Sequence, residues 1–269
     1  MNFELNIFQW YGGPRVTWFS IWHIMYLVVI TASIILMGVR IKKKGNTCEA
    51  KEKMLNGIAA TILALYIADF FLMPLYRANG DSTRQLVDID KLPFHLCTLM
   101  AVLIQFAQFN TKLKKCAWFK EIVTVLSIVA AAIYLVYPGT AFRDIGAFNF
   151  TIMQTFLFHG LVLAWGILNL TTGTVKLNVK NIWKVSVALV VVILWAMLGN
   201  AIYSYAIPSL KFNWCFLEEP VFSFQTAQTM PFFFHGAIIS ISAIVYAIND
   251  IVKAIIKKIK AKREVSETS

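Results

Sequence analysis

Seven long apolar segments set the strongest limit on what this chain of 269 residues can fold into. Each is near the roughly 20 residues that a helix needs to cross the hydrocarbon core of a bilayer. Hydrophobic residues make up 58% of the chain, and the mean hydropathy of +0.66 is far above that of a soluble domain. We therefore expect an all-α, polytopic membrane protein, a bundle of seven transmembrane helices at residues 16–39, 55–76, 92–109, 121–137, 147–170, 182–206 and 230–248.

Basic residues are distributed unevenly over the loops. The chain has 25 of them against 14 acidic residues, and its formal net charge is +11. Nineteen of the 25 fall in alternate loops and in the C-terminal tail. Because loops rich in lysine and arginine stay in the cytoplasm, we expect the N-terminus outside, the C-terminus inside and the plasma membrane as the location. This distribution accounts for the charge, so nucleic acid is not expected as a partner.

Two short segments flank the predicted bundle, which spans residues 16–250. Residues 1–15 contain aromatic side chains, such as Trp10 and Tyr11, that are typical of the membrane interface. No basic region precedes the first apolar segment, so a cleaved signal peptide is not expected. Residues 251–269 read as a basic cytoplasmic tail.

The sequence gives little support for a cofactor. Its four cysteines show no C-x-x-C spacing and no disulfide framework. Three histidines with an aspartate could hold zinc, but no H-E-x-x-H motif is present, and we expect no metal. The last segment has no lysine for a retinal Schiff base, and no Walker A or paired-glycine nucleotide motif occurs.

Every histidine of the chain lies inside an apolar segment, where an ionisable side chain is costly and by default marks a functional site. Three of them fall within the first eight residues of helices that enter from outside, and one lies deeper. Asp69 and Asn200 belong to helices that run outward and fall in the same half. We expect these side chains to surround one outward-facing cavity; the alternative is that each ties neighbouring helices together by a hydrogen bond.

Helical spacing and chemistry suggest roles for these residues. Thr98 shares a face with His95, and a neutral imidazole can accept a proton from a hydroxyl, a thiol or water near neutral pH. The expected catalytic residues are His95, His159, Thr98 and Cys97. The expected substrate-binding residues are His23, Asp69, Gln154, Asn200, Tyr203 and His235.

Several motifs resemble the YwaF-like family of bacterial integral membrane proteins. The motifs are Leu-Pro-x-His-x-Cys at residues 92–97, a histidine at 159, Gly-Asn at 199–200 followed by tyrosine at 203, and a histidine at 23. The similarity covers about residues 16–250 and implies the same seven-helix layout.

Eukaryotic relatives of that family look like acyltransferases that act on ether glycerophospholipids. The resemblance carries over His95 and His159 as the shared polar pair. In those relatives a proposed catalytic cysteine immediately precedes the histidine of the third helix. This chain has Phe94 there, and Cys97 follows three positions later.

We therefore expect a lipid-processing enzyme that transfers or hydrolyses an acyl group in the outer leaflet, with membrane lipids as partners. His95 would act as general base, with His159 and Asn200 at the ester, and the nucleophile stays open between Thr98, Cys97 and water. One alternative is a small-solute or proton-coupled transporter that uses the same cavity. Another is a scaffold that binds a partner through residues 207–229. The oligomeric state is not indicated.

Overall fold

The computed structural model describes residues 14–77, 89–138, 146–207, 212–219 and 224–268. Seven α-helices account for most of these residues, and no β-strand occurs among them. The all-helical prediction is therefore confirmed. The helices are α1 (Ile21–Lys43), α2 (Cys48–Arg77), α3 (Leu96–Phe109), α4 (Ala117–Val136), α5 (Phe150–Thr171), α6 (Ile182–Ala206) and α7 (Met230–Thr268).

Six of the seven helices are long and apolar enough to cross a membrane. The exception is α3, which has 14 residues and is therefore only about 21 Å long at 1.5 Å per residue. A hydrocarbon core is about 30 Å thick, so α3 does not span it as a helix alone. The prediction of a membrane-embedded helical protein is confirmed for six helices, and the third segment is shorter than expected.

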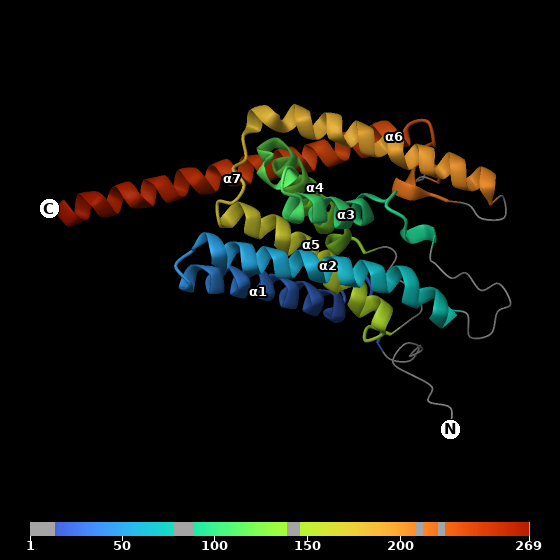
Figure 1. Ribbon diagram of the computed structural model, residues 1–269, viewed down its shortest axis with the longest axis horizontal. Helices are drawn as coiled ribbons and strands as arrows, with labels where there is room; N and C mark the ends of the chain where they lie inside the picture. Colours follow the sequence, from blue (N-terminus) through green and yellow to red (C-terminus); the bar gives the residue numbers. More distant parts are fainter. Residues whose placement is uncertain (1–13, 78–88, 139–145, 208–211, 220–223, 269) are drawn as a thin grey trace, which may run out of the picture.

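Helix α4 lies at the centre of the bundle (Figure 1). It packs against α5, α3, α6 and α7, while α2 packs on α5 and α3, and α1 lies at the edge against α5. Residues 120–131 of α4 are all buried. Because a helix that is apolar all round has no face suited to water, its burial at the centre is expected.

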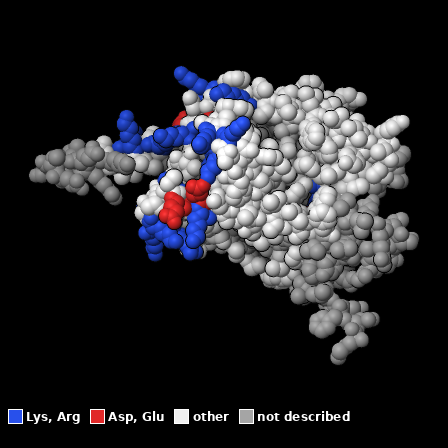
Figure 2. All heavy atoms as spheres, viewed as in Figure 1, with Lys and Arg blue, Asp and Glu red and all other residues white. Residues whose placement is uncertain are grey.

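The bundle has two ends of different character. The basic end carries the α1–α2, α3–α4 and α5–α6 connections, and most of the described lysine and arginine side chains gather there (Figure 2). The opposite end carries the α2–α3, α4–α5 and α6–α7 connections. All the loops that were expected in the cytoplasm thus lie at one end.

Helix α3 begins later than predicted. Pro93 was expected in its first turn, but the helix starts at Leu96 and residues 92–95 form a turn, with Phe94 N–H donating to Leu92 O at 2.7 Å. The Trp195 indole N–H donates to Pro93 O at 2.8 Å, which fixes this turn against α6. Tertiary contacts therefore override the local preference of proline for a helix start.

The ends of the chain also differ from the prediction. Helix α1 begins at Ile21, later than predicted. Pro14 is bound to the α4–α5 connection instead, because Ala147 N–H donates to Pro14 O at 2.7 Å. Residues 1–13, most of the predicted interfacial segment, lie outside the described residues. At the other end, α7 continues as one helix to Thr268 and projects beyond the bundle, so residues 251–268 of the predicted tail are helical (Figure 1).

A buried carboxylate joins three parts of the fold at the basic end. Glu121 of α4 is 4% exposed, and its Oε1 accepts from Asn178 N–H and from the Tyr246 hydroxyl, both at 3.0 Å. Its Oε2 accepts from Asn181 Nδ2 at 2.6 Å. Helix α4, the α5–α6 connection and α7 therefore share one acceptor group.

Replacing Glu121 with alanine is expected to lower the free energy of unfolding by about 3 kcal/mol, because three donors lose a charged acceptor. Thermal unfolding of the detergent-solubilised protein measures the effect. Glu49→Ala is the matched control, since Glu49 is an exposed carboxylate in the first turn of α2. Equal unfolding midpoints for the two variants would show that the Glu121 contacts contribute nothing.

Candidate functional site

Cys215 and His95 meet at the opposite end of the bundle, where the short 3-10 turn η5 (Trp214–Phe216) packs on the start of α3. The backbone N–H of Cys215 donates to His95 Nδ1 at 3.2 Å, and Cys215 Sγ donates to Phe94 O at 3.3 Å. The N–H of Leu96, the first residue of α3, bonds to the same sulfur. Cys215 and His95 thus form one site, 120 residues apart in sequence.

The backbone at this thiol adopts an uncommon conformation. Cys215 has φ 56° and Phe216 has φ 59°, both in the left-handed region that non-glycine residues rarely adopt. Each such residue costs about 1 kcal/mol or more unless its surroundings hold it in place. Strained backbone of this kind tends to occur at functional sites.

The surroundings keep the thiol protonated. Burial raises the pKa of Cys215 to about 12, and the Leu96 N–H opposes that shift in the pKa. The side chain is therefore a thiol at neutral pH and needs a base before it can act as a nucleophile.

His95 is the nearest such base. Because its Nδ1 accepts from Cys215 N–H, the neutral ring carries its proton on Nε2. That Nε2 has no hydrogen bond to any residue in the described ranges. The ring also lies 5.9 Å from the Phe216 ring, measured between centroids.

Asn200 and Tyr203, two of the predicted substrate-binding residues, hold this loop in place. Asn200 Oδ1 accepts from Trp214 N–H at 2.9 Å, and Asn200 Nδ2 donates to Trp214 O at 3.2 Å. Tyr203 packs edge-on against the Trp214 ring at 5.4 Å and the Phe94 ring at 5.9 Å. Their contacts position Cys215 rather than line a cavity.

Asp69 lies at the same end of the bundle. Its carboxylate pairs with Lys91 Nζ at 2.8 Å, and the Tyr66 hydroxyl donates to Lys91 O at 2.8 Å, so α2 holds the segment that leads into α3. Lys91 precedes His95 by four residues, so this ion pair lies close to the start of α3 in the chain.

His159 is half of the predicted catalytic pair and lies two turns into α5. Its Nδ1–H donates to Thr155 O of its own helix at 2.8 Å, and its ring stacks on Tyr134 at 3.7 Å with an interplanar angle of 7°. The Nε2 atom has no hydrogen bond to a described residue. Gln154, one position before Thr155, donates instead to Leu65 O of α2 at 3.4 Å.

The two nucleophiles proposed on α3 are both engaged with backbone carbonyls. Thr98 Oγ1 donates to Leu92 O at 3.1 Å and to His95 O at 3.0 Å. Cys97 Sγ points at Ala130 O of α4, 3.7 Å away. These hydrogen bonds indicate a structural role for both side chains: Thr98 binds the turn before α3, and Cys97 joins α3 to α4.

His23 and His235 do not join the others, which corrects the expectation of one shared cavity. His23 is fully buried, accepts from Phe19 N–H at 3.1 Å and donates to Leu135 O at 2.8 Å, so it ties α1 to the end of α4. His235 bonds to the Ser186 hydroxyl at 3.0 Å, near the basic end of α6. Because Ser186 is in the second turn of α6, His235 lies nearer the basic end than the sequence predicted.

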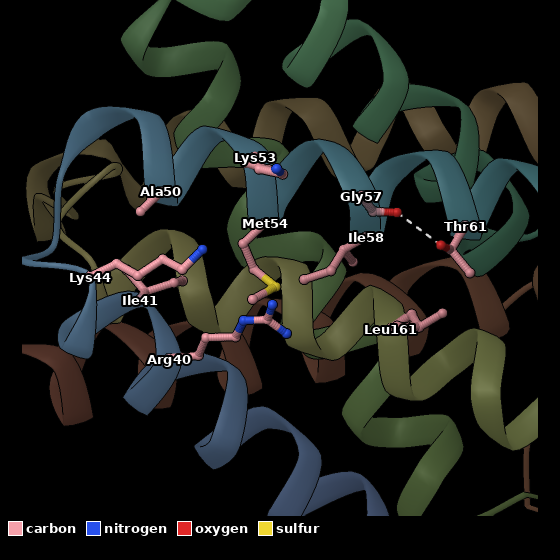
Figure 3. A pocket seen from close by; sticks show the side chains of 10 residues that line it. All are labelled: Arg40, Ile41, Lys44, Ala50, Lys53, Met54, Gly57, Ile58, Thr61 and Leu161. Atoms are coloured by element: carbon pink, nitrogen blue, oxygen red, sulfur yellow. Dashed lines mark hydrogen bonds between the residues drawn. The ribbon is translucent and has the colours of Figure 1, made fainter.

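Neither of two cavities found among the described residues is lined by a histidine. One, of about 370 Å³, is an apolar hollow on the outer face of α1. The other, of about 350 Å³, lies between α1 and α2 at the basic end (Figure 3). Within the described ranges no three His, Cys, Asp or Glu side chains come close enough to share a metal ion.

The amino-acid sequence was also compared with known proteins. The model of the TMEM164 family, a membrane protein family, matches residues 18–249. The chain belongs to the TMEM164 family. No curated protein and no solved structure matches it. In this TMEM164-family chain the match spans all the site residues that the sequence predicted, from His23 to His235.

Cys215 and Lys91 are the site residues that sequence reasoning missed. Both lie outside the apolar segments, and the criterion of a costly polar group applies only inside those segments. One signal was present: residues 212–217 contain two phenylalanines, a tryptophan and a leucine around the cysteine. Such an apolar loop is expected to fold back onto the bundle.

Proposed function

We propose that this protein is an enzyme that moves an acyl group of a membrane phospholipid through a thioester on Cys215, in the outer leaflet of the plasma membrane. The observation that carries the proposal is the junction of Cys215 with His95 at the first N–H of α3. A thiol, an imidazole and a backbone donor on neighbouring residues are the groups that acyl transfer requires.

The chemistry runs in two steps. When residues 213–217 move away from α3, the Cys215 N–H releases His95 Nδ1, and this nitrogen then accepts the thiol proton. Sγ attacks the ester carbonyl, and the N–H at the start of α3 stabilises the developing oxyanion. The carbon–oxygen bond of the ester breaks, and His95 Nε2–H gives its proton to the departing alkoxide. In the second step a hydroxyl of another lipid, or water, attacks the thioester and restores the thiol.

The family likeness supports this assignment. The YwaF-like resemblance extends to eukaryotic proteins in which the proposed catalytic cysteine stands where this chain has Phe94. Here the Cys215 thiol bonds to the carbonyl of that same residue. The loop therefore places the Cys215 thiol next to position 94, where the eukaryotic relatives have a cysteine and this chain has a phenylalanine.

Lys91 and His159 are suited to bind the substrate. The Lys91 ammonium is a partner for the lipid phosphate, and the free Nε2 of His159 is an acceptor for a hydroxyl. Cys215 is 2% exposed, so the ester reaches the sulfur only after residues 213–217 move away from α3.

The test is acyl release from labelled phospholipids by the purified protein in liposomes. His95→Asn keeps an acceptor for the Cys215 N–H but cannot take a proton near neutral pH, and we expect it to lower the rate by about a hundredfold. His235→Asn is the matched control, because that histidine bonds to Ser186 away from the site.

Two results would contradict the enzyme. One is lipid turnover that is the same with and without protein. The other is turnover that His95→Asn and His235→Asn leave equally unchanged. Solute uptake that depends on His159, without lipid turnover, would instead identify the transporter that the sequence left as an alternative.

A further inference from the structure

A cavity of about 350 Å³ opens between α1 and α2 at the basic end, far from Cys215 (Figure 3). Three basic residues line it: Arg40 and Lys44 at the end of α1, and Lys53 in the second turn of α2. The Arg40 and Lys44 side chains extend toward Met54 in the middle of the cavity (Figure 3).

No described acidic side chain pairs with any of these three cations, and the nearby carboxylate of Glu52 is engaged by Lys114. Three like charges around one cavity repel one another, and an anion placed between them removes that repulsion. Arginine and lysine are the side chains that bind phosphate oxygens.

The floor of the same cavity is apolar. Ile41 and Ile58 are 1% and 5% exposed, and Leu161 of α5 and Met54 complete the floor. Gly57 leaves the wall open, since a Cβ added there would meet no atom within 4 Å. A free phosphate ion would use the cations and leave this apolar surface bare.

We infer that this cavity binds an anionic glycerophospholipid from the leaflet at the basic end, with the phosphate between the three cations and the first acyl carbons on the apolar floor. Basic pockets between transmembrane helices are suited to such headgroups. The ligand would also join α1, which lies at the edge of the bundle, to α2 and α5. This site is independent of the proposed enzyme.

Binding of fluorescent phosphatidylglycerol to the detergent-purified protein tests the inference, with phosphatidylcholine carrying the same label as the zwitterionic comparison. We expect phosphatidylglycerol to bind at least about tenfold more tightly, and Arg40→Gln and Lys53→Gln each to weaken it by about fivefold. Lys42→Gln is the matched control: it removes the same charge from an exposed residue of α1 that does not line the cavity.

A second variant tests the apolar half. Gly57→Leu fills the cavity without changing any charge, and the open space around Gly57 admits the larger side chain. We expect it to weaken lipid binding at least about fivefold, with an unfolding temperature equal to or above that of the unmodified protein.

Three results would overturn the site. They are equal binding of the two lipids, equal effects of Lys42→Gln and Arg40→Gln, and unchanged binding by Gly57→Leu. Millimolar inorganic phosphate is the remaining arm. If it displaces the lipid completely, the site is one for soluble phosphate and the assignment to a lipid fails.

Discussion

Cys215→Ala is expected to abolish acyl release, lowering the rate by at least about a hundredfold, while Cys97→Ala leaves most of it. The reason is that Cys215 contacts His95 through its backbone N–H and has its sulfur at the start of α3, whereas the sulfur of Cys97 faces Ala130 of α4. Removing a covalent nucleophile eliminates the step, because no other group occupies its place. Release from labelled phospholipid in liposomes measures both variants.

Two additional variants separate chemistry from packing. Cys215→Ser keeps a donor for Phe94 O but is a poorer nucleophile, so we expect its activity to be low and its unfolding temperature close to that of the unmodified protein. Cys48→Ala is the neutral control, since Cys48 is exposed at the basic end. Full activity of Cys215→Ala would remove this residue from the mechanism and return the question to Thr98, Cys97 or water.

A covalent intermediate gives an independent readout. During turnover we expect the labelled acyl group to appear on the unmodified protein, to be released by hydroxylamine, and to be missing from Cys215→Ala. An acyl group retained by Cys215→Ala would place the thioester on another cysteine. The measurement uses mass spectrometry of the intact protein.

The helices of this fold could be predicted because apolar length and charge are properties of each segment alone. Helix α6 (Ile182–Ala206) lies where the apolar run predicts it. Helix α3 could not be bounded in the same way, because its start depends on where Trp195 donates its indole proton. The residues around Pro93 and Phe94 do not indicate that Trp195 is the hydrogen-bond partner.

The candidate site was predicted only in part. His95, His159 and Asp69 attract attention because a charged or imidazole group is costly in an apolar segment. The same criterion also selected His23 and His235, which are satisfied by Leu135 O and by Ser186. The free-energy cost of burial identifies a polar group that needs a partner. Only the fold shows whether a neighbouring helix supplies that partner.

Cys215 was beyond the reach of that criterion. A cysteine is not costly in an apolar environment. Its closeness to His95 arises from a contact between residues that are 120 positions apart in sequence. The contact depends on Asn200 holding both backbone polar groups of Trp214. Asn200 was expected to bind substrate, and the prediction missed that an amide can hold a loop by its own donor and acceptor.

The packing beneath the site leads to the second large prediction. A Cβ added at Gly199 of α6 would lie 2.5 Å from Cδ1 of the Phe94 ring, closer than carbon atoms approach. The ring cannot withdraw easily, because Trp195 and Trp214 pack on it with centroids at 4.8 Å and 4.7 Å. Helix α6 and the turn before α3 therefore approach each other as closely as a glycine permits.

Gly199→Ala is accordingly expected to destabilise the protein by about 1–2 kcal/mol, since overpacking exceeds the gain in helix propensity of about 1 kcal/mol. Gly236→Ala is the matched control: it is also helical, but its added Cβ meets no atom within 4 Å, so we expect equal or higher stability. Thermal unfolding in detergent compares the two variants, and equal midpoints would contradict the close approach of Gly199 and Phe94.

In Gly199→Ala, the rate of acyl release should fall by a larger factor than the equilibrium constant for folding. A displaced Phe94 moves its own carbonyl, which accepts from Cys215 Sγ, and also moves His95, the next residue. A misplacement of about 1 Å at reacting groups can lower a rate by about a hundredfold. The double variant Gly199→Ala with Phe94→Leu removes most of the ring that clashes, so we expect it to recover stability relative to the sum of the two single effects. Additive effects on stability would show that the two residues do not share this contact.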